Sequence, residues 1–390
     1  MITTITYKGF MRAGKEIFNA KGLLCFVLFL LLLTTTAGRA QSPFAGLEPL
    51  FTQPKSYTAY FAEKAPVIDG NINDEVWKKV SWSERFEDIE GDAKPKPTFE
   101  TRVKMVWNDT HLFIAAELKE PHVWATLKQH DEIIFHDNDF EVFLDPENTT
   151  HGYYEVEVNA LNTIFDLFLP KPYRNGGSAM IPWNLHKLQS AVQVQGTLNN
   201  PKDTDQGWTV EMAIPFRSVS MGNDTKVPDE GSMWRINFSR VEWDVEVKNG
   251  KYVKKKDKNG QPLPEHNWVW SPQGVVNMHY PERWGYLHFT RQKAGGKAVA
   301  FNLPYAEKQK KYLWLVYYRQ QEYYEKHKLY ATSLAQLGFE EEERVVIENQ
   351  PNQLQLDATR HQFMATIQGP NNAVWSINQE GLIQKLKNTL

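Results

Sequence analysis

The sequence contains little of what the common enzyme and nucleic-acid signatures require. Its 390 residues include one cysteine, Cys25, which excludes an internal disulfide framework and a zinc site built from several thiolates. The formal net charge is -3, so no general electrostatic attraction to nucleic acid is expected. The sequence has no nucleophile elbow, phosphate-binding loop or dinucleotide-binding fingerprint. These absences leave carboxylate-based enzymes, binding proteins and assembly proteins as the classes to weigh.

The first part of the chain has the pattern of a secretory signal. Basic residues, including Lys8, precede an apolar run at residues 23–33, and small residues follow up to Ala40. This pattern predicts that residues 1–40 are a signal peptide cleaved after Ala40, with an uncleaved anchor as the alternative. Cleavage removes Cys25. The sequence therefore predicts an exported bacterial protein, which is periplasmic, on the cell surface or extracellular, with no membrane span after cleavage.

Short segments of alternating polarity, separated by turn residues, fill the range 101–290. They predict β-strands, because successive side chains of a strand point to opposite faces of a sheet. The sequence therefore predicts an all-β fold, an antiparallel β-sandwich of jelly-roll-like form. The predicted strands lie at residues 101–107, 112–118, 139–145, 153–159, 164–169, 191–198, 208–214, 233–242 and 284–289.

Two of these strands, 139–145 and 153–159, form the most informative predicted hairpin. One of its faces is apolar and the other is rich in carboxylates. If the connecting loop closes simply, Glu141 lies directly opposite Glu157, and like charges in that position destabilise a sheet. The carboxylate face is either solvated or a polar binding surface. In the second case a shared proton, a metal ion or a basic side chain should neutralise it, and Arg235 and Asn237 are the candidate residues to face the glutamates.

The carboxylates around the hairpin also fit two other chemistries. A glycoside hydrolase needs two carboxyl groups about 5 Å apart if it retains configuration and about 6.5–9.5 Å apart if it inverts, and Glu141 and Glu157 fit that need. A calcium site needs several oxygen ligands, which Asp137, Asp139 and Asp145 supply. Ordinary turn hydrogen bonding is the alternative for these aspartates.

Several histidines lie close together in the sequence. No two of them have the helical spacing of a zinc motif. The sequence therefore favours no histidine metal site among them. They are His111, His122, His130, His136 and His151.

The composition changes near residue 295. The range 305–337 has no Gly or Pro, and its apolar residues follow helical spacing. It predicts a helix with a break near Tyr330 and a second short helix that ends at Gly338, followed by three strands. The predicted division is a signal peptide at 1–40, a leader at 41–60, a β-sandwich at 61–292, and a C-terminal helix with short strands at 293–390.

Six segments between residues 66 and 290 follow the order of one known family. They are residues 67–77, 106–116, 139–145, 153–159, 207–215 and 284–289. Together they resemble the carbohydrate-binding family 9-like domains of secreted bacterial proteins. The resemblance implies a β-sandwich that binds sugar chains, often beside a glycosidase, with calcium in structural sites and no required cofactor.

The resemblance also implies where a sugar would bind. The family clamps a terminal sugar between two tryptophan rings, and this chain has Phe135 at the first position and Met278 or His279 at the second. Glu141 matches a carboxylate that contacts the sugar, whereas Glu157 stands where the family has an arginine. The predicted ligand-binding residues are Phe135, Glu141, Glu157, Asn159, Arg235 and Met278.

The sequence as a whole favours an exported, non-catalytic protein that binds polysaccharide or oligosaccharide and acts in polysaccharide recognition or catabolism. One alternative is a glycoside hydrolase that uses Glu141 and Glu157. Another is a surface assembly or adhesion component that uses the aromatic C-terminal helix. A nucleic-acid partner is not expected, and the sequence does not identify a protein partner.

Overall fold

The computed structural model describes residues 42–339 and 344–387. The predicted signal peptide, with Cys25 and the cleavage site after Ala40, lies outside the described residues. Among the helices that are described, none is both long enough and apolar enough to cross a membrane.

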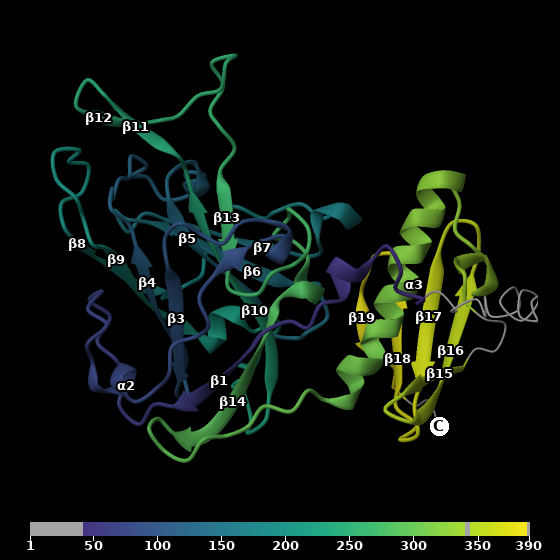
Figure 1. The fold of residues 1–390 in the computed structure, drawn as a ribbon. Coiled ribbons are helices and arrows are strands. Elements are labelled where there is room, and N and C mark those ends of the chain that lie inside the picture. Colours follow the sequence, from purple (N-terminus) through teal and green to yellow (C-terminus); the bar gives the residue numbers. More distant parts are fainter. Residues whose placement is uncertain (1–41, 340–343, 388–390) are drawn as a thin grey trace, which may run out of the picture. The chain divides into compact units, whose positions relative to one another are not determined.

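A continuous sheet, curled on itself, forms the larger part of the structure (Figure 1). Its hydrogen-bonded order is β7-β6-β5-β10-β14-β1-β3-β4-β9-β8, and β13 and β2 extend it beside β10. The strands are β1 (Ser56–Phe61), β2 (Glu87–Asp88), β3 (Thr101–Trp107), β4 (His111–Lys119), β5 (Asp139–Asp145), β6 (Tyr153–Asn159), β7 (Ile164–Leu169), β8 (Gln189–Gln195), β9 (Gly207–Pro215), β10 (Met233–Glu242), β13 (His266–Val269) and β14 (Gly285–Lys293).

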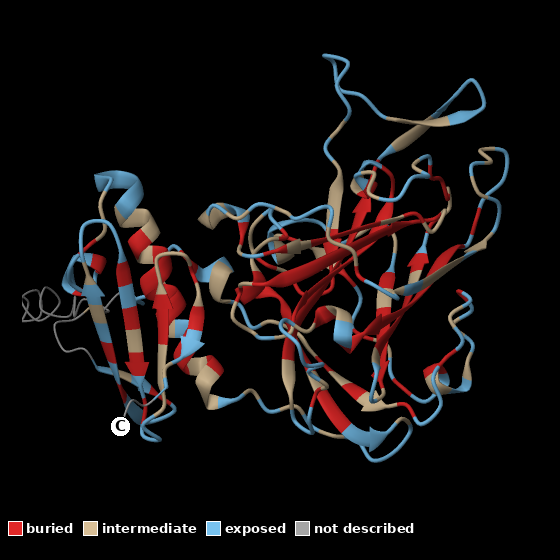
Figure 2. Cartoon of the chain, turned by 180° about the vertical axis from the view of Figure 1, so that it is seen from behind, coloured by how far each residue is buried: buried red, intermediate tan, exposed pale blue. Residues whose placement is uncertain are grey.

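The two halves of this sheet enclose the main core, which confirms the predicted β-sandwich. Because side chains alternate along each strand, Phe140 and Val142 of β5 face inward together with Met105 of β3 and Met212 of β9. Trp107 is also fully buried there. Figure 2 shows the strands of both halves as mostly buried. Burial of this apolar surface is the main stabilising contribution to the sandwich.

Strand β1 was not predicted, because it lies in the segment assigned as a leader. The leader contains the short helix η1 (Glu48–Phe51) and then β1, which pairs in parallel with β14 and with β3. Tyr57 and Ala59 are buried and alternate with more exposed neighbours, as expected for a strand with one face toward the core. A parallel strand needs a crossover connection. The crossover between β1 and β3 carries α2 (Glu75–Lys78).

Helix α2 covers the outer face of strands β4 and β9. Trp77 is fully buried there, and its indole N–H donates to Glu211 Oε1 at 2.7 Å. The backbone N–H of Gly70 donates to Glu211 Oε2 at 3.0 Å. Gly70 has φ +83°, and an added Cβ would lie 2.7 Å from the backbone nitrogen of Gln193, so only glycine fits this turn. The segment at residues 67–77 therefore has a structural role.

The C-terminal part contains the predicted helix, α3 (Tyr305–His327), and a sheet of five strands rather than three. The predicted second helix is a single 3₁₀ turn, η7 (Ala335–Leu337). Helix α3 packs against β17 and β18 (Figure 1). The sheet order is β15 (Arg344–Ile347), β16 (Gln350–Ala358), β17 (Phe363–Gln368), β18 (Val374–Asn378) and β19 (Ile383–Lys385).

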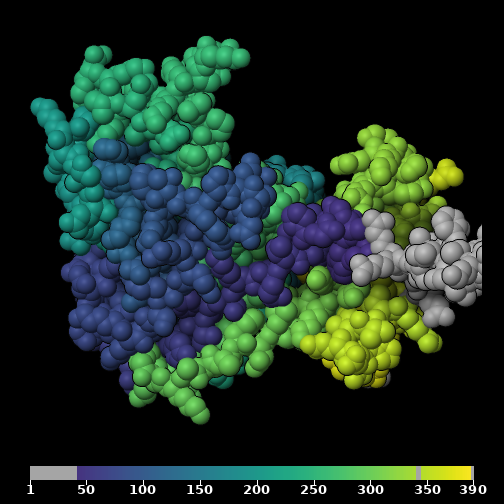
Figure 3. Space-filling view, in the orientation of Figure 1, coloured from purple at the N-terminus to yellow at the C-terminus, as the bar shows by residue number. Residues whose placement is uncertain are grey.

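A two-stranded hairpin, β11 (Val245–Lys248) and β12 (Lys251–Lys254), follows β10 and projects from the sandwich, as Figure 3 shows in green. The sequence is charged here, and most of the hairpin is exposed or half-buried. Its base is fixed, because the Lys254 ammonium lies 3.2 Å from the ring centroid of Trp243.

Candidate functional site

The predicted register of the hairpin formed by residues 139–145 and 153–159 is confirmed. Strands β5 and β6 pair antiparallel with Glu141 directly opposite Glu157, and Phe143 lies opposite Glu155. One interpretation expected the outer face of the hairpin to be solvated. The structure contradicts it, because Glu141 is 5% exposed and Glu157 is 2% exposed. The turn η3 (Ile134–His136) and the segment after β13 contribute residues that pack over this face. The carboxylates are therefore held inside the protein.

A cleft of about 420 Å³ opens onto this face. It brings together four of the six predicted ligand-binding residues, which come from four separate segments of the chain. These are Phe135, Glu141, Glu157 and Met278. The other lining residues include Ile133, Phe143, Glu155, Phe165, Leu167, Tyr173, Ala179, Ile181, Val241, Glu265, Asn267, Asn277 and His279.

Hydrogen bonds fix one wall of the cleft at Phe135. Its backbone N–H donates to Glu157 Oε2 at 3.0 Å, and its carbonyl accepts from the indole N–H of Trp243 at 2.8 Å. These bonds tie the η3 turn to the floor of the cleft and to strand β10's end. The Phe135 ring is therefore presented on a rigid support rather than on a free loop.

The opposite wall contains Met278 and His279. Met278 is only 9% exposed, and its sulfur accepts a hydrogen bond from Gln273 at 3.0 Å. The His279 ring lies 2.9 Å from the hydroxyl of Tyr153 and packs edge-on against the Tyr173 ring, with centroids 4.5 Å apart. Met278 is thus a structural part of the wall, and Tyr173 supplies the exposed ring.

The carboxylates in and beneath the cleft have strongly altered acidity. Burial, and then the neighbouring carboxylates, raise the pKa values of Asp139, Glu141 and Glu157 well above their usual range. The same causes raise the pKa of Glu155 to about 8. Burial, with Arg174 nearby, lowers the pKa of His279 to about 4, so this ring is neutral near pH 7 and does not neutralise the glutamates.

The structure regroups the predicted calcium ligands. Oxygens of Asp139, Glu141 and Glu157 lie within 4.8 Å of one another, and Asp139 Oδ2 has no hydrogen-bond partner although the residue is fully buried. Carboxylate oxygens so arranged fit a calcium ion, which takes six to eight oxygen ligands. Asp145 lies six residues farther along strand β5, about 20 Å away, and cannot share that ion.

Asp137 also has another role than the predicted one. Its carboxylate accepts hydrogen bonds from the backbone N–H groups of Thr126 and Leu127, at 2.7 and 2.9 Å, and from the Asn159 amide at 3.0 Å. Asn159 also donates to the carbonyl of Leu127, and its oxygen accepts from Leu161 and Thr163. Both side chains support the loop before the cleft and are absent from its lining.

Arg235 is not the counter-ion of the facing glutamates, which corrects that expectation. In the sheet register it lies opposite Asp145, at the far end of β5. Its guanidinium donates to Glu307 Oε2 at 3.0 Å. Because a residue's neighbours along β10 are set by the sheet register, Arg235 lies opposite Asp145 while Ser239 lies opposite Glu141. Its charge therefore joins the sandwich to helix α3.

Sequence reasoning missed Tyr173, Ile133 and Ile181, three apolar residues that are 40–43% exposed and line the cleft. Such a group of exposed apolar side chains around a polar floor is typical of a binding surface. Tyr173 lies in a turn between Pro172 and glycines, where an aromatic residue has no predicted core to join. A tyrosine in such a turn was the sequence feature that could have identified Tyr173 as a binding residue.

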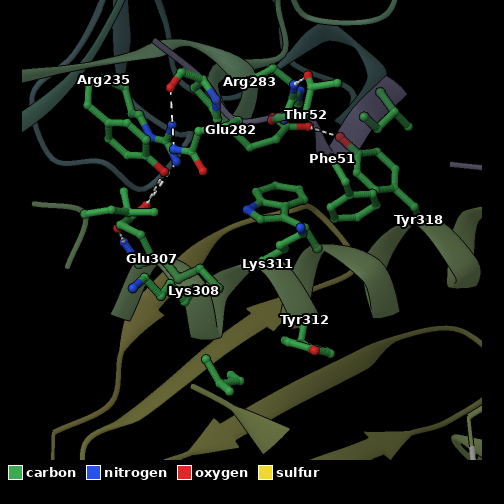
Figure 4. Close-up of a pocket in the computed structure, with 18 of the residues that line it drawn as sticks. Phe51, Thr52, Arg235, Glu282, Arg283, Glu307, Lys308, Lys311, Tyr312 and Tyr318 are labelled. Atoms are coloured by element: carbon green, nitrogen blue, oxygen red, sulfur yellow. Dashed lines mark hydrogen bonds and ion pairs between the residues drawn. The ribbon is translucent and has the colours of Figure 1, made fainter. Parts of the chain in front are cut away.

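A second pocket, of about 390 Å³, lies beside helix α3 (Figure 4). Its charged groups are largely paired with one another: Glu307 accepts from Arg235 and Lys310, and Lys308 is paired with Glu348. Arg283 donates to the backbone carbonyl and hydroxyl of Thr52. Because these charges are already paired, and the Arg235–Glu307 pair joins the sandwich to helix α3, we assign the candidate site to the cleft instead.

Comparisons with known proteins identify a family for this chain. Residues 68–262 match the family model described as carbohydrate family 9 binding domain-like. Comparison with curated protein sequences gives no match.

Among solved structures, the chain is similar to a family 9 carbohydrate-binding module from Caldicellulosiruptor kristjanssonii in complex with cellotriose. The identity is 15% and the TM-score 0.37, over 63% of this chain and 100% of that chain, and a complex with glucose gives the same values. A crystal structure of a candidate carbohydrate-binding protein from Bacteroides uniformis ATCC 8492 matches at 17% identity and a TM-score of 0.44, over 61% of this chain and 100% of that chain.

Proposed function

Because the chain belongs to the carbohydrate family 9 binding domain-like family, we propose that its cleft binds a sugar chain without cleaving it. One observation carries the proposal: Phe135, Glu141, Glu157 and Met278, four of the six ligand-binding residues predicted from the sequence, line one cleft. The cellotriose and glucose complexes of the structural relatives make β-glucans the first ligands to test.

The chemistry of the cleft suits a sugar ring. A sugar offers an apolar face for stacking on an aromatic ring and hydroxyl groups for hydrogen bonds. Phe135 and the half-exposed Tyr173 provide rings, and the glutamates of the floor provide polar groups. A glutamate with a raised pKa keeps its proton near pH 7, so it can donate as well as accept a hydrogen bond. The floor therefore offers both roles to hydroxyl groups.

Replacing Tyr173 by Ala is expected to weaken binding of the preferred oligosaccharide about 10-fold, because it removes a stacking contact of about 1–1.5 kcal/mol. Phe135→Ala should have a similar effect. Isothermal titration calorimetry after a glycan-array screen measures both. Tyr324→Ala, which removes another partly exposed tyrosine on helix α3, is the matched control and should bind normally.

The same samples test the hydrolase alternative. That alternative draws support from two facing carboxylates with raised pKa values, since a glycosidase needs one protonated acid. If the wild type releases sugar from the oligosaccharide and Glu157→Gln does not, the proposal of binding without cleavage is wrong. The protein is then a glycoside hydrolase that uses Glu157. Equal affinity of wild type, Tyr173→Ala and Phe135→Ala would instead place any sugar site outside the cleft.

We further propose that the protein is exported and acts in polysaccharide recognition or catabolism. The support is the charged segment, apolar run and small residues of positions 1–40. N-terminal sequencing of protein recovered from outside the cytoplasm should begin at Gln41. Recovery of the chain with residues 1–40 still attached in the membrane fraction would favour the uncleaved anchor.

A further inference from the structure

An unassigned cluster of one histidine and two aspartates lies behind the cleft. His130 and Asp131 are on the loop before η3, and Asp166 is on strand β7. His130 Nε2 lies 3.4 Å from Asp131 Oδ1 and 3.5 Å from Asp166 Oδ1, and donor atoms of all three lie within 4.8 Å of one another. Two ligands on a tetrahedral ion with bonds of about 2.0–2.2 Å lie about 3.4 Å apart, so the spacing matches.

Backbone groups orient the donor atoms toward a common point. The carbonyl of Ile164 accepts from His130 Nδ1 at 3.0 Å, which directs Nε2 toward the carboxylates. The N–H of Leu185 donates to Asp166 Oδ2, so the other oxygen is left for a ligand. Asp166 Oδ1 and Asp131 Oδ1 have no hydrogen-bond partner, although the Asp166 side chain is only 3% exposed. Such supporting bonds are typical of metal ligands.

The surroundings of the His130 ring require a positive charge. The amide oxygen of Asn184 lies 2.6 Å from Nε2, and its nitrogen donates to the carbonyl of Pro182 at 3.3 Å, so the oxygen faces the ring. Both ring nitrogens thus face oxygen acceptors. A neutral imidazole has only one N–H to donate. Two states resolve this: the ring carries a second proton, or the Asn184 oxygen moves aside and Nε2 binds a metal ion.

We propose that His130, Asp131 and Asp166 bind a divalent transition-metal ion of the zinc class, with water completing the coordination. One imidazole and two carboxylates suit such an ion, whereas calcium takes six to eight oxygens. The His130 side chain is 50% exposed, so the ion can enter from solvent. The two buried orphan oxygens make this cluster different from an ordinary surface ion pair.

The position of the cluster gives the metal a structural consequence. Asp131 lies two residues before Ile133, which lines the cleft. Phe165 and Leu167, on either side of Asp166, also line it. A bound ion would join these segments and hold the cleft in one shape. This consequence rests on the proposed sugar-binding function, whereas the metal site itself does not.

Titration of the full chain with zinc chloride alone, after removal of metal with a chelator and without sugar, tests the site. We expect the calorimetric titration to show one binding event that His130→Gln and Asp166→Asn each weaken at least 10-fold. The asparagine substitution keeps an acceptor for the Leu185 N–H. His361→Gln, which removes an exposed histidine of the C-terminal part, should leave zinc affinity unchanged.

A wild type that binds no zinc would overturn the proposal and leave a doubly protonated His130 as the explanation. Unchanged zinc affinity in His130→Gln would overturn it as well, because the ion would then bind elsewhere. If Asp166→Asn does not fold, His130→Gln decides alone, since that side chain is half exposed. Sugar affinity with and without zinc is measured separately, so failure of sugar binding leaves the metal result standing.

Discussion

We expect the free energy of unfolding of the wild type to fall between pH 4.5 and about pH 8, and Glu155→Gln to show a much smaller fall. The pKa of Glu155 is raised from 4.5 to about 8, chiefly by burial and then by the charge of Glu141. The folded protein therefore keeps a proton that the unfolded chain releases. The stabilisation is fully present below pH 4.5 and is lost as the pH rises through about 8.

The expected size of this effect is large. A shift from 4.5 to about 8 corresponds to at most about 5 kcal/mol, which is a substantial fraction of a domain's total stability. Asp139, Glu141 and Glu157 have raised pKa values too, so some pH dependence will remain in the variant. Denaturant unfolding at several pH values measures the difference. Glu325→Gln, on an exposed part of helix α3, is the matched control.

Two outcomes would reject this account of the buried carboxylates. If wild type and Glu155→Gln show parallel stability curves from pH 4.5 to 8, Glu155 is not protonated in the folded state. If a calcium chelator abolishes the stability of the wild type at low and high pH alike, a bound ion rather than protons neutralises the cluster. Calcium added at a pH high enough to ionise Asp139, Glu141 and Glu157 should stabilise the wild type more than Glu157→Gln, because the variant lacks one of the three carboxylates.

Replacing Glu307 by Ala is expected to destabilise the protein by about 3–5 kcal/mol, the typical cost of removing one partner of a buried ion pair. Glu307 is 6% exposed and accepts from Arg235 at 3.0 Å, Lys310 at 2.7 Å and Asn148 at 3.0 Å. Burial alone would raise its pKa, but Lys310 and Arg235 hold that pKa below its usual value. Its loss removes the carboxylate that is ion-paired with two buried cations, Arg235 and Lys310.

A matched variant lies on the same helix. Glu322 and Arg319 form an ion pair with the same spacing of three residues, but Glu322 is 39% exposed. Glu322→Ala should therefore cost less than about 1 kcal/mol. Oligosaccharide affinity of Glu307→Ala should be unchanged under conditions where it stays folded, because Glu307 is not part of the cleft. Equal costs for the two variants would show that the buried pair does not hold the C-terminal part in place.

The sequence by itself determined the local pattern of the protein. Alternation of polarity gave the strands of the sandwich, and the absence of Gly and Pro over residues 305–337 indicated helix α3. The short loop between β5 and β6 also fixed the pairing of Glu141 with Glu157. These features depend on neighbours in the sequence, so they can be read without the rest of the fold.

Only the tertiary structure decided what those residues touch. Whether the carboxylate face is solvated or buried depends on loops that pack over it, and the register of β10 places Arg235 beside Asp145. The pairing of β1 with β14 joins segments more than 200 residues apart, which no local pattern specifies. In the same way, His130 and Asp166 come together only because a loop folds back on strand β7, so their spacing in the sequence shows no metal motif.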